Sequence, residues 1–339
     1  MVKTEILSTH TPQLFSDAVK RAADRLCAGE VVALPTETVY GLAANALDAR
    51  AVAKIFQIKG RPAHNPLIVH VAGLEMARRC VKDFPEAAEQ FSRAFWPGPL
   101  TMVLPAAKII PDTVTAGGQT VGIRWPSHPF IQAVIRACDF PLAAPSANLS
   151  NQVSPTNAGH VRAQLDGKIP LIVDGGQSQV GIESTVLDLS VSPPKILRPG
   201  MIHAESLAAV GFGVQSAGGM SDEPAAGPLR SPGRLQKHYS PKAKLLILNW
   251  NDEAGLRSQL ANLAVPFSTS HIIAHTRIPG GEAFAGVSVI PHDAEAFARA
   301  LYAELHRCDE AGVKHIVVEM PPDAPEWSGI LDRLQRAAA

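Results

Sequence analysis

The segment at residues 59–67 concentrates side chains that suit an anionic ligand. Its sequence, KGRPAHNPL, places Lys59, Arg61 and Asn65 beside two prolines, between an expected helix and an expected strand. Lys and Arg supply charge-assisted donors to phosphate oxygens, and proline stiffens the backbone that carries them. A solvated helix terminus would explain a single cation there. Two cations followed by an amide favour a pocket for a phosphate-bearing ligand.

Four other segments are rich in small hydroxyl and amide side chains. They read PTETVYG at 35–41, APSANLS at 144–150, SPT at 154–156 and GIEST at 181–185. Such groups bind phosphate or the edges of a base without adding charge. The first segment follows an expected strand, and the carboxyl ends of strands commonly face a ligand crevice in α/β proteins. Each segment alone also fits ordinary turn and helix-start chemistry. Their candidate residues are Thr38, Ser146, Asn148, Ser154 and Ser184.

Two further cations stand at the ends of expected strands. Arg124 closes a strand in GGQTVGIRWP, which also contains Thr120, and Arg198 does so in ILRPG. Arginine before Trp-Pro suits bidentate recognition of a carboxylate, although a surface ion pair would explain it equally well. His70 lies in the apolar run LIVHV at 67–71, where a buried core histidine is the simpler interpretation. Its place just after the basic loop makes it a candidate contact for a second substrate.

The motifs that are missing narrow the chemistry. The sequence contains no GxxxxGK[ST] phosphate loop, no HExxH zinc motif, no EF-hand loop and no GxSxG nucleophile elbow. A site with several donors and no activated nucleophile indicates catalysis by positioning and charge neutralisation. Many phosphoryl and nucleotidyl transfers work in this way.

Length and composition predict two domains that each bury a core, because the chain has 339 residues and 46% of them are hydrophobic. The 31 Lys and Arg residues balance 31 Asp and Glu residues, which argues against a broad electrostatic surface for nucleic acid or membrane. The four cysteines form no CxxC pair, so neither a disulfide framework nor a zinc site is expected. The sequence shows no secretory signal and no bilayer-spanning apolar run, which predicts a soluble cytoplasmic protein.

Short strands and helices alternate from residue 1 to residue 210, with many loops rich in Pro and Gly between them. Strands are expected at 31–34, 67–71, 100–104, 121–124, 171–174, 185–189 and 196–198, and helices at 48–59, 87–95, 129–137 and 157–165. Their irregular spacing predicts a mixed sheet of α+β character rather than a simple βαβ repeat. This first domain, residues 1–210, contains every candidate residue named so far.

Residues 211–243 are rich in Gly, Pro and Ser, which predicts a linker. Its second half, SPGRLQKHYSP, holds donors and the aromatic ring of Tyr239, more than an inert tether needs. Strands at 244–248, 271–274 and 315–319 then alternate with helices at 252–263, 294–308 and from 330 onward. That order predicts a small α/β domain with a parallel sheet over residues 244–339. The second domain lacks a GxGxxG turn and any cluster of catalytic residue types.

Taken in order, these segments closely resemble the YrdC-type family of threonylcarbamoyl-AMP synthases. The resemblance covers residues from about 25 to 200 and rests on PTETVYGL, KGRP..NPL, WPGPLT, VGIRWP, APSAN, SPT, GIESTV and ILRPG. The motif SPG....HYSP and the second α/β domain resemble the longer, two-domain branch. Members couple L-threonine, bicarbonate and ATP into threonylcarbamoyl-AMP and pyrophosphate. This is the first step in modifying the tRNA adenosine next to the anticodon.

The resemblance implies a twisted mixed sheet that encloses a deep basic cavity, a linker that acts as a lid, and a Rossmann-like C-terminal domain. It implies Mg2+ carried with ATP, no dedicated metal site, and transfer of the product to downstream tRNA threonylcarbamoyl transferase proteins without stable direct tRNA binding. Matched position by position, the motifs assign threonine contacts to Thr38, His70, Arg124 and Ser184. They assign catalysis to Lys59 and Arg61, and ATP contacts to Lys59, Arg61, Asn65, Thr120, Ser146, Asn148, Ser154, Arg198 and Tyr239.

Two alternatives remain at this stage. A non-catalytic RNA-binding module would use a concave basic surface, but zero net charge and the lack of aromatic residues interleaved with basic ones argue against it. Carbamoyl transfer to another acceptor is found in related domains of hydrogenase maturation proteins. Those proteins carry zinc-finger and acylphosphatase-like segments that this sequence lacks.

Overall fold

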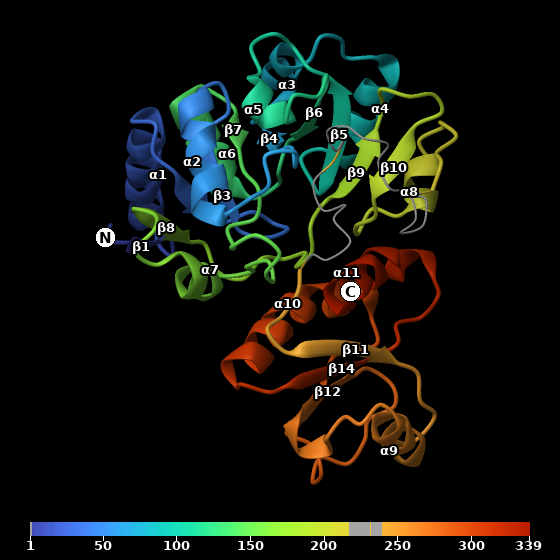
Figure 1. The fold of residues 1–339 in the computed structure, drawn as a ribbon. Coiled ribbons are helices and arrows are strands. Elements are labelled where there is room, and N and C mark those ends of the chain that lie inside the picture. Colours follow the sequence, from blue (N-terminus) through green and yellow to red (C-terminus); the bar gives the residue numbers. More distant parts are fainter. Residues whose placement is uncertain (1, 217–230, 232–238) are drawn as a thin grey trace.

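The computed structural model describes residues 2–216, 231 and 239–339, which form two domains (Figure 1). The larger, N-terminal domain carries one sheet and the smaller, C-terminal domain carries another. The linker expected at 211–243 falls mostly outside the described residues, so its action as a lid stays a prediction. Gln215, within that range, forms a bridge with Lys195 at the margin of the first sheet.

The described residues of the N-terminal domain form a ten-stranded sheet with the order β1-β8-β2-β3-β7-β4-β6-β5-β9-β10. Strand β4 pairs with β6 in parallel, whereas β5 pairs with β6 antiparallel. The expectation of a mixed sheet is therefore confirmed. The strands are β1 (Glu5–Ser8), β2 (Val32–Leu34), β3 (Gly41–Asn45), β4 (Ile68–His70), β5 (Leu100–Pro105), β6 (Thr120–Arg124), β7 (Leu142–Ala143), β8 (Leu171–Asp174), β9 (Thr185–Asp188) and β10 (Lys195–Arg198).

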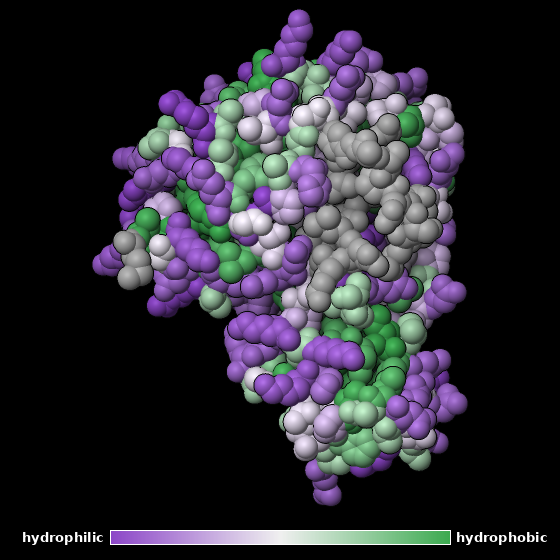
Figure 2. Space-filling model, in the orientation of Figure 1, coloured by the Kyte–Doolittle hydropathy of each residue, from purple (hydrophilic) through white to green (hydrophobic). Residues whose placement is uncertain are grey.

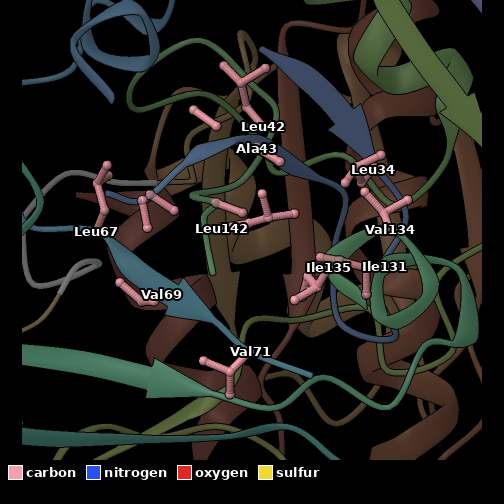
Figure 3. Packing of buried hydrophobic residues seen from close by; sticks show 14 of the residues in the cluster. Leu34, Leu42, Ala43, Leu67, Val69, Val71, Ile131, Val134, Ile135 and Leu142 are labelled. Carbon is pink, nitrogen blue, oxygen red and sulfur yellow. The ribbon is translucent and has the colours of Figure 1, made fainter. Parts of the chain in front are cut away.

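Helices cover this sheet and close its core. Helices α1 and α6 pack against each other, and Figure 3 shows Ile131, Val134 and Ile135 of α6 beside Leu34 of β2. Burial of such side chains is the main force that holds the layers together. The helices are α1 (Pro12–Cys27), α2 (Ala49–Lys59), α3 (Leu74–Cys80), α4 (Glu86–Phe95), α5 (Asp112–Thr115), α6 (Pro129–Cys138), α7 (Ala158–Leu165) and α8 (Ala204–Ala208).

Helix α2 shows how local sequence positions the basic loop. Asp48 caps the helix by accepting a hydrogen bond from a backbone amide of the first turn at 2.8 Å. Gly60 ends it in the left-handed conformation, with φ 62°, which glycine adopts without steric cost. The helix therefore ends as expected, with Lys59 in its last turn and Arg61 directly beyond the glycine.

Several elements of this domain were not expected from the sequence, namely β1, α1, β3, α3, α5, β7 and α8. Helix α1 buries mainly alanines, together with Leu26, and was missed although Thr11 caps it and Pro12 follows the cap, which are local signals for a helix start. Strand β3, with the sequence GLAAN, lacks the β-branched residues that mark strands, and only its pairing with β2 and β7 makes it one. Tertiary pairing overrides local propensity at β3.

The C-terminal domain is the expected small α/β domain with a parallel sheet. Its strands are ordered β11-β14-β12-β13 and all neighbouring pairs are parallel. Strand β11 lies at the edge, and Figure 2 shows hydrophobic residues gathered on the surface in that region. The elements are β11 (Lys244–Leu248), α9 (Glu253–Asn262), β12 (Ser270–Ala274), β13 (Gly286–Val289), α10 (Ala294–Glu310), β14 (His315–Glu319) and α11 (Ser328–Ala338), with short 3-10 turns at Phe267–Thr269 and Pro325–Trp327.

Helices α10 and α11 lie between the C-terminal sheet and the N-terminal domain (Figure 1). The backbones of the two domains approach closely there. A Cβ atom on Gly181, whose φ is +87°, would lie 2.3 Å from the carbonyl oxygen of Ala298 in α10. A Cβ on Gly329 of α11 would lie 2.9 Å from the backbone of Gly200. Larger side chains at these two glycines would push the domains apart.

The four cysteines are not all buried. All four cysteines are free, and Cys80, Cys138 and Cys308 are buried, but Cys27 at the end of α1 is exposed. Burial raises the pKa of Cys80 to about 11 and the pKa of Cys138 and Cys308 to about 12. None of the described helices has the length and apolar character needed to cross a bilayer.

Candidate active site

Strand pairing brings the candidate residues of distant segments together. His70 and Arg124 end the parallel strands β4 and β6 and are partners in register. Strand β5 runs opposite to β6, so its beginning lies near Arg124. The start of β9 pairs with the start of β5, and β10 returns antiparallel to β9. Ser184, just before β9, and Arg198, at the end of β10, therefore reach the same region.

A cavity lies where these strands and loops meet. Ile68 and His70 of β4 both line it, as side chains two residues apart on a strand must share a face. The cavity encloses about 50 Å³, whereas small-molecule pockets usually measure about 300–1,000 Å³. Nucleotide binding therefore needs this conformation to widen. The predicted site residues in the lining are Thr38, Arg61, His70, Arg124, Ser146, Ser184, Arg198 and Tyr239.

Arg124 is the centre of one half of the cavity, and it is not the surface ion pair that the sequence left open. Its Nη1 donates to Thr38 Oγ1 at 2.9 Å, its Nε donates to the carbonyl of Gly98 at 3.2 Å, and its Nη2 lies 2.6 Å from Glu37 Oε1. Burial alone would raise the pKa of Glu37, but the charge and hydrogen bond of Arg124, with a backbone bond from Ser127, lower it below the ordinary value. A buried, ionised pair thus holds the guanidinium in place.

His70 and Ser184 flank this arginine. His70 is 3% exposed, and burial, followed by the nearby Arg124 charge, lowers its pKa to about 3, so the ring is neutral at physiological pH. Its Nδ1 atom is buried without a hydrogen-bond partner. Ser184 Oγ shares a 2.8 Å hydrogen bond with Thr101 Oγ1 and accepts another from Arg198 Nη2 at 3.1 Å. Small polar groups and a neutral imidazole therefore surround the arginine.

Buried cations lie at the other half of the cavity, where Arg61 is part of the lining and Lys59 is not. Lys59 donates from Nζ to the carbonyl oxygens of Ser146 and Asn148. Arg61 donates from Nη2 to Asn65 Oδ1 and to a neighbouring carbonyl, each at 2.7 Å. Burial lowers the pKa of both Lys59 and Arg61, and Arg61 adds to the effect on Lys59 by repulsion.

Arg198 joins this group. It donates from Nη2 to the Ser184 carbonyl at 2.9 Å, and burial lowers its pKa. Its charge lowers the pKa of Arg61 as well, since the two guanidinium groups repel each other. Cations that are desolvated and mutually repulsive gain most from a multiply charged anion. The arrangement is therefore suited to a phosphate chain.

The structure places the other predicted residues, Lys59 included, outside the described lining of the cavity. Asn65 and Asn148 are buried next to the cations, and Asn65 Nδ2 and Asn148 Oδ1 have no hydrogen-bond partner. Buried polar atoms without partners are rare in proteins and point to a ligand or water. Ser154 is fully buried and donates to Glu183 Oε1 at 2.6 Å. Thr120 begins β6, about 13 Å from Arg124 at strand spacing, and does not line the described cavity.

Tyr239 links the cavity to the C-terminal domain. It is 1% exposed and lines the cavity. Its ring stacks on Tyr302 of α10 with centroids 5.9 Å apart, and the Arg333 guanidinium lies 5.3 Å from its centroid. This tyrosine was predicted as an ATP contact, and its burial beside the cavity is compatible with that role.

Sequence reasoning missed three residues of this region, namely Glu183, Tyr302 and Arg333. Glu183 lies in the GIEST segment but was assigned no role, whereas the structure places it in the cavity lining. Tyr302 and Arg333 bind it from the C-terminal domain. No contact of the C-terminal domain with the cavity wall, apart from the linker, was predicted from the sequence. A separation of 119 and 150 residues leaves no local signal for such contacts.

One group of potential metal ligands occurs among the described residues, away from the cavity. A ligand atom of each of His271, Glu304 and Cys308 lies within 4.8 Å of the others. Arg307 donates from Nη2 to His271 Nε2 at 2.9 Å and also binds Glu304. The guanidinium thus already supplies the positive charge that a metal ion would bring, and this cluster is better described as an ion-paired network.

Comparison with known proteins finds relatives that match nearly the whole chain. A Sua5/YciO/YrdC family model, described as telomere recombination, matches residues 24–200, and a threonylcarbamoyl-AMP synthase C-terminal domain model matches residues 202–339. The threonylcarbamoyl-AMP synthase of Pyrococcus abyssi is 38% identical, with 94% of each chain covered. The Bacillus subtilis enzyme of the same name is 40% identical, with coverage of 99% of this chain and 95% of the relative. The crystal structure of P. abyssi Sua5 complexed with L-threonine has a TM-score of 0.89 at 35% identity, covering 99% of this chain and 97% of that one.

Proposed function

This chain belongs to the family of threonylcarbamoyl-AMP synthases, and from that membership we propose that it joins L-threonine, bicarbonate and ATP into threonylcarbamoyl-AMP and pyrophosphate. The observation that carries the proposal is a cavity with two chemically different halves. Arg61 and Arg198 line one half and, with the buried Lys59 near Arg61, form a cationic group that suits a triphosphate, while Arg124 lies among hydroxyls in the other half and suits a carboxylate.

The Arg124 half would bind threonine. A guanidinium has five N–H donors, and the contacts with Thr38, Gly98 and Glu37 leave some of them for the amino-acid carboxylate. Neutral His70, with its unpartnered Nδ1, and Ser184 would contact the remaining polar groups of the substrate. Steric closeness of these groups would favour a small β-hydroxy amino acid over larger ones.

The cationic half would bind ATP. Lys59, Arg61 and Arg198 would contact the phosphates, with Asn65, Ser146, Asn148, Ser154, Thr120 and Tyr239 as the further contacts that the family resemblance assigns. Glu37 and Glu183 are the carboxylates nearest to the cavity, and each is paired with an arginine. These pairs already neutralise both carboxylates, so the Mg2+ that accompanies ATP would be held mostly by phosphate oxygens and water.

The reaction needs no nucleophilic side chain. The neutral threonine amine attacks carbon dioxide and loses a proton, or attacks bicarbonate with loss of water, to form a carbamate. A carbamate oxygen then attacks the α-phosphorus as the bond to the leaving pyrophosphate breaks. Lys59 and Arg61 would stabilise the charge that develops on the phosphates. Carbamates decompose in water, so a cavity closed on all sides protects the intermediate.

An omission assay tests this function. The protein is incubated with ATP labelled at the α-phosphate, L-threonine, bicarbonate and Mg2+, and labelled product and pyrophosphate are both measured. We expect both to form only when threonine, bicarbonate and ATP are present together. Turnover that persists without threonine, or salt-dependent tRNA binding with no ATP turnover, would instead support a different enzyme or the RNA-binding alternative.

The product would leave for proteins that transfer the threonylcarbamoyl group to tRNA. A stable complex between this chain and tRNA is not expected, because the formal net charge is zero. A cytoplasmic setting fits the four free cysteines, which a reducing compartment preserves.

A further inference from the structure

Glu183, in the wall of the cavity, is bound by residues of the other domain. Arg333 of α11 donates from Nε to Glu183 Oε2 at 2.7 Å, and the Tyr302 hydroxyl of α10 donates to the same oxygen at 3.0 Å. Arg333 also donates from Nη2 to the Glu183 carbonyl at 3.3 Å. The Arg333 side chain is fully buried, so loss of either partner would leave the other charge unpaired in the interior.

The second carboxylate oxygen faces the candidate nucleotide residues. Glu183 Oε1 accepts a 2.6 Å hydrogen bond from Ser154 Oγ, and the Ser154 carbonyl accepts one from His306 Nε2 of α10 at 3.1 Å. Burial alone would raise the pKa of Glu183, but the charges of Arg333 and Arg198 lower it to about 2. The carboxylate is therefore ionised, and its negative charge lies near both Ser154 and Arg198.

Close backbone contacts hold the two helices at this place. Gly181, two residues before Glu183, packs on α10, and Gly200, two residues after Arg198, packs on α11. Both loops that carry the cavity residues are thus fixed against the C-terminal domain on either side of the Glu183–Arg333 pair. Rigid support of this kind is what a precisely arranged binding site requires.

We propose that Arg333 and Tyr302 are positioning residues for the nucleotide side of the active site, acting through Glu183 on Ser154 and Arg198. The C-terminal domain then completes a site whose substrate contacts lie outside it. This inference rests on the proposed function and adds a role for residues 244–339 in catalysis. Neither residue touches the substrates, so their effect should be confined to the substrate whose contacts they support.

Steady-state kinetics of full-length variants test this role. Pyrophosphate release is measured with ATP varied at saturating threonine, and with threonine varied at saturating ATP. Arg333→Met removes the ion pair and should raise KM for ATP about tenfold, the low end of the effect of a lost charge-assisted contact, because Arg333 acts on the nucleotide only indirectly. Tyr302→Phe removes a single hydroxyl and should raise KM for ATP about threefold. KM for threonine should stay within about twofold in both variants.

Three comparisons separate positioning from a loss of folding. Arg299→Ala removes another inter-domain hydrogen bond, from Arg299 Nε to the Gln179 carbonyl at 2.8 Å, without touching Glu183, and should leave both KM values unchanged. Arg333→Lys keeps the positive charge and should therefore raise KM for ATP less than Arg333→Met does. Tyr302→Phe should have little effect on KM for ATP once Ser154→Ala is present, because both changes break the same chain of contacts.

The outcomes distinguish this inference from the proposed function. A wild-type protein without threonine-dependent turnover would overturn both. An active wild type whose Tyr302→Phe and Arg333→Lys variants change both KM values equally, or neither, would overturn the positioning role alone. If Arg333→Met fails to fold, those two milder variants and the Ser154 background still decide the matter.

Discussion

Replacing Arg124 by alanine should destabilise the fold as well as threonine binding, with a diagnostic pH dependence. Arg124 is 4% exposed and Glu37 is 3% exposed, so removal of the arginine leaves a carboxylate in the interior without its cation. Breaking a buried pair in this way costs about 3–5 kcal/mol. We therefore expect Arg124→Ala to lose about that much unfolding free energy at neutral pH.

The pH dependence follows from the Glu37 carboxyl. In the folded wild type, the pKa of Glu37 is lower than in the unfolded chain, mainly because the effect of Arg124 outweighs that of burial. The ionised carboxylate therefore stabilises the fold above the unfolded pKa. This contribution is lost as pH falls through the folded pKa. Without Arg124, burial raises the pKa instead, and the variant loses stability as pH rises from the unfolded pKa through the folded one. The difference between the two proteins should therefore grow with pH.

Urea unfolding of both proteins at about pH 5 and about pH 7.5 measures this difference. The double variant Glu37→Gln/Arg124→Met serves as the matched control, since it removes both charges together. It should recover most of the lost stability at neutral pH but should still bind threonine weakly in calorimetry. A loss below about 1 kcal/mol in Arg124→Ala, or a loss that is equal at both pH values, would refute the buried ion pair.

Three further results are expected. Arg61→Ala should raise KM for ATP by about 10- to 100-fold, the equivalent of a lost charge-assisted contact, and leave KM for threonine nearly unchanged in the same assay. Threonine affinity measured by calorimetry should show no His70 titration between about pH 5.5 and pH 8, because the pKa of His70 is lowered to about 3. A change in affinity near the ordinary histidine pKa that disappears in His70→Gln would contradict this. Gly181→Ala should cost more unfolding free energy than Gly60→Ala, because both have positive φ but only the first would place a Cβ 2.3 Å from the Ala298 carbonyl; equal losses in thermal unfolding would argue against the tight domain contact.

Local sequence was sufficient to predict the basic loop. Asp48 and Gly60 mark the ends of α2 through capping chemistry that involves neighbouring residues only. The position of Lys59 and Arg61 follows from that helix, and both side chains are buried beside the cavity as a ligand pocket requires. Their individual roles, like those of the other predicted site residues, remain predictions that the kinetics above would test.

Contacts between distant segments could not be predicted. The carboxylate next to Arg124 comes from Glu37, in the loop between β2 and β3, and no spacing rule connects a loop residue with the end of β6 before the strands are paired. The C-terminal residues that bind Glu183 are more distant still, and an arginine or tyrosine on a helix gives no sign of which side chain it meets. Strand β3 was missed for the same reason, because its pairing partners rather than its own residues make it a strand.

The most direct test of the two-part cavity is a structure of the full-length protein with L-threonine and a non-hydrolysable ATP analogue. We predict the threonine carboxylate on Arg124 and the phosphate chain among Lys59, Arg61 and Arg198, in a cavity wider than the about 50 Å³ described here. A triphosphate bound on the Arg124 side, or either ligand bound outside this cavity, would contradict the assignment of its two halves.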